Sequence, residues 1–115
     1  MAAARRGLFQ GIVALGCVIK GQTDHSEYIN HAVATGLGQI AIQSGVPVSF
    51  GVITAATAGQ ARDRAGGAHG NKGTEAMDAL LDALAAQEAL ADAAQADRPG
   101  FAFRLGRDPQ KPGVK

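Results

Sequence analysis

The feature that most constrains the fold is a short apolar run that passes through glycines into the start of a helix. Residues 12–15 read Ile-Val-Ala-Leu. The run is too short for a helix and rich in β-branched residues, which is typical of a strand buried on both faces of a parallel sheet. The chain then breaks at Gly16 and Gly21, and a helical pattern begins near Ser26. We therefore expect a strand, a glycine-bearing turn and a helix N-terminus in direct succession.

This helix start predicts a site for an anion. The first backbone N–H groups of a helix have no partner within the helix, and the helix dipole adds partial positive charge there, so phosphate binds well at such a corner. The polar residues Gln22, Thr23 and Asp24 lead into it, and His25 lies at its rim. Histidine can exchange a proton near neutral pH. The residues alone leave open whether His25 does so or is an ordinary surface residue.

A helix and a second strand are expected next. Asp24 and Glu27 are spaced as a capping box, and apolar residues recur at helical spacing as far as Ser44, where Gly45 supplies the stop. Residues 46–54 are expected to form the second strand. Small residues on the helix would let another helix approach closely, and they are Ala32, Ala34, Gly36 and Gly38.

Two more helices are predicted around a glycine-rich loop. Thr57 and Gln60 are spaced as a capping box that opens a short helix through Ala65. The loop at 66–73 lacks the Gly-Lys-Ser/Thr of a P-loop, so we interpret it as a flexible connection that positions Lys72. An amphipathic helix follows to about residue 96. Its apolar side is marked by Ala76, Met77, Leu80, Leu81 and Leu84, and its acidic side by Glu75, Asp78, Asp82, Glu88 and Asp92.

Alternating strands and helices predict an α/β fold with a parallel sheet and right-handed crossovers. Only two strands are evident, and a two-stranded sheet leaves its edges and faces uncovered, so the chain looks like the second half of a doubly wound domain. Residues 2–8 look like the end of a further helix. We expect one domain at 1–97 and a disordered tail at 98–115, since the tail holds three of the four prolines and five basic residues against one acidic residue.

Composition excludes several functions. Cys17 is the only cysteine, so no internal disulfide can form, and this fits a cytoplasmic protein. We interpret Cys17 as a small buried apolar residue rather than as a nucleophile. The net charge of +1 gives no reason to expect a nucleic-acid partner. No apolar run is long enough to span a membrane. The three histidines lack metal-ligand spacing, so we predict no metal. Arg62 and Arg64 are either solvated or suited to hold phosphate.

The motifs together resemble those of the lumazine synthases. They are Ala-Leu-Gly-Cys-Val-Ile-Lys-Gly-Gln-Thr-Asp-His at 14–25, Gly-Val-Pro-Val-Ser-Phe-Gly-Val-Ile-Thr at 45–54, and Arg-Ala-Gly at 64–66 followed by Gly-Asn-Lys-Gly at 70–73. The resemblance runs from about residue 2 to residue 90. It implies a flavodoxin-like three-layer α/β/α sandwich that assembles as pentamers or larger shells and uses no cofactor. It also implies the condensation of 5-amino-6-(D-ribitylamino)uracil with 3,4-dihydroxy-2-butanone 4-phosphate to 6,7-dimethyl-8-ribityllumazine, a step of riboflavin biosynthesis.

The resemblance also implies roles for individual residues. His25 matches the family's proton-transfer histidine. Gln22 and Thr23 match its phosphate-binding turn, Arg64 matches the arginine that pairs with the same phosphate, and Lys72 matches a lysine near that site. Four further residues match parts of the substrate pocket. Cys17, Val18 and Ile19 match the segment that lines the pocket for the pyrimidine and the ribityl chain. Phe50 matches a residue that contacts the pyrimidine across the subunit interface.

The family's first half has no counterpart in this chain. That half carries the first two strands, the first helix and much of the pyrimidine site. Three interpretations stay open: a lumazine synthase whose chain is truncated or starts at a mis-assigned position, an inactive remnant of that enzyme, and a non-enzymatic module that binds phosphate ligands or joins an assembly. The joint presence of Thr23, His25 and Arg64 favours the first.

Overall fold

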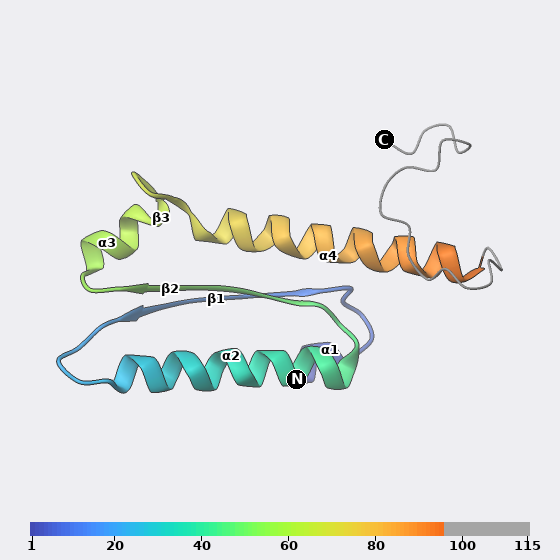
Figure 1. Cartoon of the computed structure of the whole chain (residues 1–115), viewed down its shortest axis with the longest axis horizontal. Helices are drawn as coiled ribbons and strands as arrows, with labels where there is room; N and C mark the ends of the chain where they lie inside the picture. Colours follow the sequence, from blue (N-terminus) through green and yellow to red (C-terminus); the bar gives the residue numbers. More distant parts are fainter. Residues whose placement is uncertain (96–115) are drawn as a thin grey trace.

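A computed structural model of the chain describes residues 1–95 and has two helical layers around a small parallel sheet (Figure 1). The elements in chain order are α1 (Ala2–Arg5), β1 (Ile12–Ile19), α2 (His25–Ser44), β2 (Val48–Ala55), α3 (Ala58–Asp63), β3 (Ala65–Gly67), β4 (Gly70–Asn71) and α4 (Lys72–Gln95). α2 lies on one face of the sheet, and α3 and α4 lie on the other. The expected α/β class and three-layer arrangement are confirmed. The predicted boundary at residue 97 and the tail at 98–115 lie outside the described residues.

The sheet consists of β1 and β2 in parallel. Their register runs from Ile12 opposite Val48 to Ile19 opposite Ala55. The backbone N–H of Lys20 donates to the carbonyl of Ala55 at 2.8 Å and extends the ladder by one bond. Both strands therefore end at the same edge, and the segments that follow them emerge there together.

Residues alternate between the two helical layers along each strand. Thr54 accepts a hydrogen bond from the side chain of Asn30 at 2.9 Å, so the even-numbered face of β2 lies against α2. The hydroxyl of Ser49 donates to the carbonyl of Ala76 at 2.6 Å, so the odd-numbered face lies against α4. Because even positions of β1 pair with even positions of β2, the same rule holds for β1.

β1 is longer and more exposed than the sequence suggested. The strand continues through Gly16 to Ile19 because β2 pairs with it along its whole length. The prediction that it is buried on both faces is wrong: Leu15 is 67% exposed, and Cys17 is exposed rather than buried. α4 packs more extensively on β2 than on β1, and β1 has a strand neighbour on one side only within residues 1–95.

The core is small and lies between β2 and the α3–α4 layer. Among the described residues, the buried apolar side chains are Ala4, Ile53, Ala55, Ala61, Ala76 and Leu80. Ile53, Ala55 and Ala61 form one cluster that joins β2 to α3. On α4 the sheet-facing positions are Ala76 and Leu80, whereas Met77 and Leu81 are exposed. Many large apolar side chains of residues 1–95 therefore stay exposed, among them Leu8, Leu15, Tyr28 and Ile42.

The helix ends follow the sequence signals in most places. Gly45 adopts a left-handed conformation with φ of 72° and ends α2 as expected. Thr57 Oγ1 accepts from the N–H of Gln60 at 3.1 Å and caps α3. The capping box at Asp24 is wrong, because Asp24 is the N-cap residue but its side chain makes no capping bond. Three elements also differ in length: α1 ends at Arg5, β2 begins at Val48, and α3 ends at Asp63.

Candidate functional site

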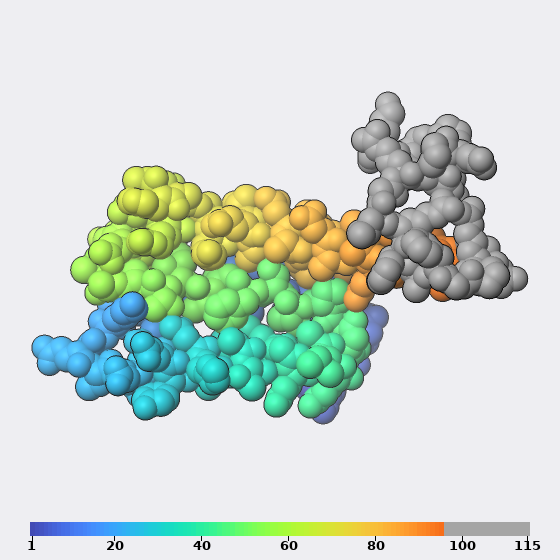
Figure 2. All heavy atoms as spheres, viewed as in Figure 1, coloured from blue at the N-terminus to red at the C-terminus, as the bar shows by residue number. Residues whose placement is uncertain are grey.

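The turn between β1 and α2 is an open corner at the carboxyl edge of the sheet. Residues 21–25 are all exposed, and Figure 2 shows this segment projecting from one end of the molecule. Thr23 Oγ1 accepts from the N–H of His25 at 3.4 Å, a long bond that orients the hydroxyl toward the helix start. Gln22, Thr23 and His25 are thus brought together at the N-terminus of a 20-residue helix. The helix start and its dipole suit this corner to an anion.

The three residues at the end of β1 do not share one face. Val18 lies on the face toward α2, whereas Cys17 and Ile19 lie on the face toward α4, because side chains alternate along a strand. Cys17 and Ile19 are exposed and Val18 is half-buried. The strand leads through Lys20 and Gly21 into the corner at residues 22–25, so Ile19 is the nearest of the three residues to this corner along the chain.

Phe50 lies away from this corner. It is exposed, faces the α2 layer, and is opposite Ala14 in the sheet register. Ala14 precedes Val18 by four residues, which is about 13 Å along a strand. Within one chain, therefore, Phe50 is separated from the residues at the end of β1.

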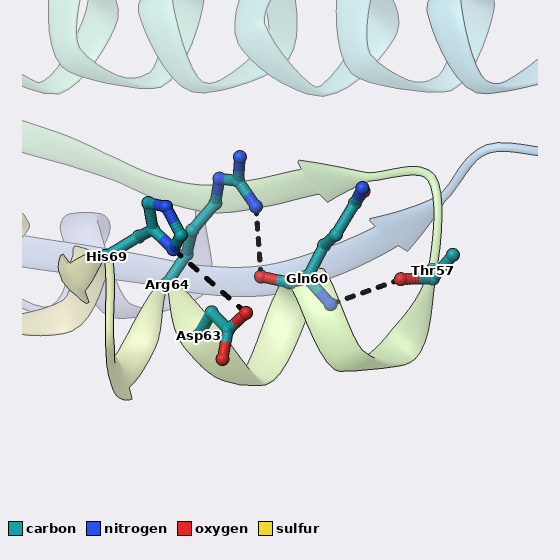
Figure 3. A network of polar contacts seen from close by, with 5 residues as sticks. All are labelled: Thr57, Gln60, Asp63, Arg64 and His69. Carbon is teal, nitrogen blue, oxygen red and sulfur yellow. Dashed lines mark hydrogen bonds and ion pairs between the residues drawn. The ribbon is translucent and has the colours of Figure 1, made fainter.

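Arg64 and Lys72 are brought together by a small hairpin. The sequence pattern predicted a flexible connection at residues 66–73, whereas the structure has β3 and β4 paired there as antiparallel strands. The backbone N–H of Lys72 donates to the carbonyl of Arg64 at 2.8 Å. The Arg64 guanidinium donates from Nη1 to the carbonyl of Gln60 at 3.1 Å (Figure 3), and Lys72 Nζ lies 3.9 Å from a carboxylate oxygen of Glu75. The backbones of Arg64 and Lys72, which carry the two cationic side chains, are thus neighbours.

The candidate site is divided between the two helical layers. The corner at Thr23 and His25 belongs to the α2 side of the sheet, and Arg64 and Lys72 belong to the α3–α4 side. Within residues 1–95, no hydrogen bond or ion pair joins the two groups. The first group offers the backbone N–H groups of a helix start and the second offers two cations, and both chemistries suit an anion.

Sequence reasoning missed the contact between Asp63 and His69. His69 Nδ1 lies 4.0 Å from Asp63 Oδ2, and the His69 N–H donates to the Asp63 carbonyl at 2.8 Å. The central residues of this turn, Ala68 and His69, lack the Asn-Gly or Asp-Gly pair that signals a two-residue hairpin, so only the glycines around them indicated a turn. Within the described residues, no three His, Cys, Asp or Glu side chains gather as a metal site, and no helix has the length and apolar character needed to cross a bilayer.

The fold and the corner at residues 22–25 define a parallel α/β protein with an exposed helix N-terminus at the carboxyl edge of its sheet, a position whose backbone chemistry suits an anion. The sequence profile of 6,7-dimethyl-8-ribityllumazine synthase matches residues 1–88. The chain belongs to this family.

Relatives support the same membership. The 6,7-dimethyl-8-ribityllumazine synthase of Rhodopirellula baltica is 54% identical over 77 residues, which are 67% of this chain and 50% of the relative. That of Levilactobacillus brevis is 43% identical over 86 residues, covering 75% of this chain and 55% of the relative. That of Porphyromonas gingivalis is 52% identical over 70 residues, covering 61% and 44%. The chain spans about half the length of the curated relatives that it matches.

Proposed function

We propose that the chain acts as a 6,7-dimethyl-8-ribityllumazine synthase, condensing 5-amino-6-(D-ribitylamino)uracil with 3,4-dihydroxy-2-butanone 4-phosphate. The observation that carries the proposal is the open corner at the start of α2, with Thr23 and His25 exposed at its rim. Family membership over residues 1–88 supports the same reaction. No cofactor is required, because imine formation, loss of phosphate and ring closure need only proton transfers.

The phosphate of the butanone substrate would bind at this corner. Backbone N–H groups near Gln22 and Thr23 hold the anion, and Arg64 supplies a guanidinium whose fork matches phosphate oxygens. Lys72 adds a second cation beside Arg64. Holding the leaving phosphate with fixed donors lowers the barrier to its departure, because charge accumulates on the leaving oxygen.

His25 would move protons between the substrates. The amine of the ribitylaminouracil attacks the ketone, an imine forms with loss of water, phosphate leaves, and ring closure expels further water. A histidine at the rim of the phosphate corner can serve as acid and base in these steps. Much of the remaining acceleration comes from holding both substrates in one orientation.

A homo-oligomer would bring the two halves of the site together. His25 at the start of α2 and Arg64 at the end of α3 belong to opposite helical layers, and Phe50 lies apart from both, so a pocket between two subunits is the simplest way to combine them. Exposed apolar side chains on α2, including Ile42 at 84% exposure, favour contacts between copies. We propose pentamers, and a cytoplasmic location for the assembly.

The pyrimidine would lie against the end of β1 and an aromatic ring of a neighbouring subunit. Cys17, Val18 and Ile19 supply the strand end, and Phe50 supplies the ring. A second candidate function is a non-catalytic module that binds phosphate and joins an assembly. The exposed face of β1 at Leu15 and Cys17 favours it, because this face is available for contact with another subunit.

The test is formation of the lumazine product by the purified chain, followed by fluorescence against an enzyme-free blank. We expect His25→Ala to lower the rate on the order of 100-fold, with His31→Ala as the matched control on the same helix. Arg64→Ala should raise KM for the butanone phosphate about tenfold, with Arg62→Ala as its control. A rate equal to the blank together with retained phosphate binding would support the non-catalytic module instead.

A further inference from the structure

We propose that Asp63 and His69 are positioning residues that hold Arg64 and Lys72 together as a clamp for a phosphate monoester. The inference rests on the proposed function, because the clamp is the cationic half of the same site. Neither Asp63 nor His69 has a part in the chemistry described above. Both act through the hairpin formed by β3 and β4.

The hairpin connects the two cations but is too small to fix its own position. The N–H of Lys72 donates to the carbonyl of Arg64 at 2.8 Å, so residues eight positions apart lie side by side. Only two register pairs make up the hairpin, Ala65 with Asn71 and Gly67 with Gly70, and the ladder is irregular between them. An isolated two-stranded hairpin is marginally stable in water. Contacts outside the ladder must therefore hold it.

Asp63 provides these contacts with its backbone and its side chain (Figure 3). Its carbonyl accepts from the N–H of His69 at 2.8 Å, and its Oδ2 lies 4.0 Å from His69 Nδ1. A Cβ on Gly67 would come within 2.8 Å of the Asp63 Cα, so the hairpin lies directly against the end of α3. Because His69 is at the tip of the hairpin, its contact with Asp63 holds the hairpin against this helix.

The same pairing keeps a carboxylate from competing with phosphate. Asp63 precedes Arg64 in the chain, and an unengaged carboxylate there would attract the guanidinium and repel an anion. Figure 3 shows Asp63 paired with His69, while Arg64 turns back along α3 to the Gln60 carbonyl. That bond uses one of the five guanidinium N–H groups. The other groups can bind phosphate oxygens.

The test uses the 115-residue chain labelled with ¹⁵N. Asp63→Asn and His69→Ala should each speed amide exchange at Lys72 and weaken binding of inorganic phosphate by about two- to fivefold, the size expected for an exposed polar contact. In the lumazine assay, the same variants should raise KM for the butanone phosphate and leave kcat unchanged. Asp63→Glu should restore both properties. Asp82→Asn and His31→Ala, at exposed positions away from the hairpin, are the matched controls.

A double variant decides whether Asp63 and His69 act as a pair. Asp63→Asn with His69→Ala should be no worse than either single variant, because one contact is lost in each. Additive effects, or unchanged Lys72 exchange and phosphate binding in both single variants, would overturn the inference.

Arg64→Ala separates this inference from the proposed function. If Arg64→Ala weakens phosphate binding and the Asp63 and His69 variants do not, the clamp is refuted and the proposed phosphate site stands. If Arg64→Ala leaves phosphate binding unchanged, the proposed site is refuted and the clamp with it.

Discussion

The side-chain amide of Asn30 donates a 2.9 Å hydrogen bond to the hydroxyl of Thr54 and thereby joins α2 to the end of β2. Asn30 lies five residues after His25, so this bond fixes the first turns of α2 relative to the sheet. The Oδ1 of Asn30 is buried without a hydrogen-bond partner among residues 1–95. Among residues 1–95, this bond is the side-chain hydrogen bond that ties α2 to the sheet close to the corner at residues 22–25.

Thr54→Val should destabilise the fold by about 1–3 kcal/mol, because it leaves the Asn30 amide without its acceptor. Asn30→Leu combined with Thr54→Val should recover part of this loss, since both polar partners are then removed. Urea unfolding measures both effects. Equal stability of the wild type and Thr54→Val would show that the bond adds nothing.

Gly51→Ala should destabilise the sheet by about 1–3 kcal/mol through overpacking. A Cβ there would come within 2.9 Å of the Ala76 Cβ, which α4 holds in place, and within 2.7 Å of the flexible end of Leu15. Gly16→Ala is the matched control, because its Cβ would meet Val52 at an ordinary 3.5 Å. Thermal unfolding that ranks the two variants in the reverse order would contradict this packing.

Leu80→Ala should cost about 2–5 kcal/mol, the range for a buried leucine. Leu80 is 5% exposed and packs close to Gly11, whereas Leu81 on the same helix is 51% exposed. Leu81→Ala should therefore cost far less. Chemical unfolding of the pair tests which side of α4 faces the sheet, and a larger loss at Leu81 would mean that the helix is rotated.

Thr57→Ala should destabilise α3 by about 1 kcal/mol, because the N–H of Gln60 loses its cap. Thr57→Ser keeps the hydroxyl and should stay close to the wild type. Since α3 carries Arg64 at its C-terminal end, weaker phosphate binding should accompany the loss. If Thr57→Ala changes neither the stability nor the phosphate affinity, the Thr57 cap does not stabilise α3.

The predicted parts of the site differ in how well the sequence located them. The local structure at Thr23 and His25 agrees with the prediction, because a strand, a turn and a helix start are signalled by neighbouring residues. Arg64 and Lys72 were named from the resemblance, but their shared hairpin was not expected, since a loop at 66–73 carries no periodic pattern. The exposure of Cys17 was misjudged because burial depends on which helix covers a strand.

The sequence by itself determined the local features of this protein. The stop of α2 at Gly45, the cap at Thr57 and the turn and helix start after β1 each follow from backbone geometry and residues a few positions apart. The tertiary structure alone decided that Gly16 lies within a strand and that His25 and Arg64 belong to opposite helical layers. It also placed Lys72 beside Arg64. These outcomes depend on pairing between segments far apart in the chain, and local sequence patterns do not predict which segments will pair.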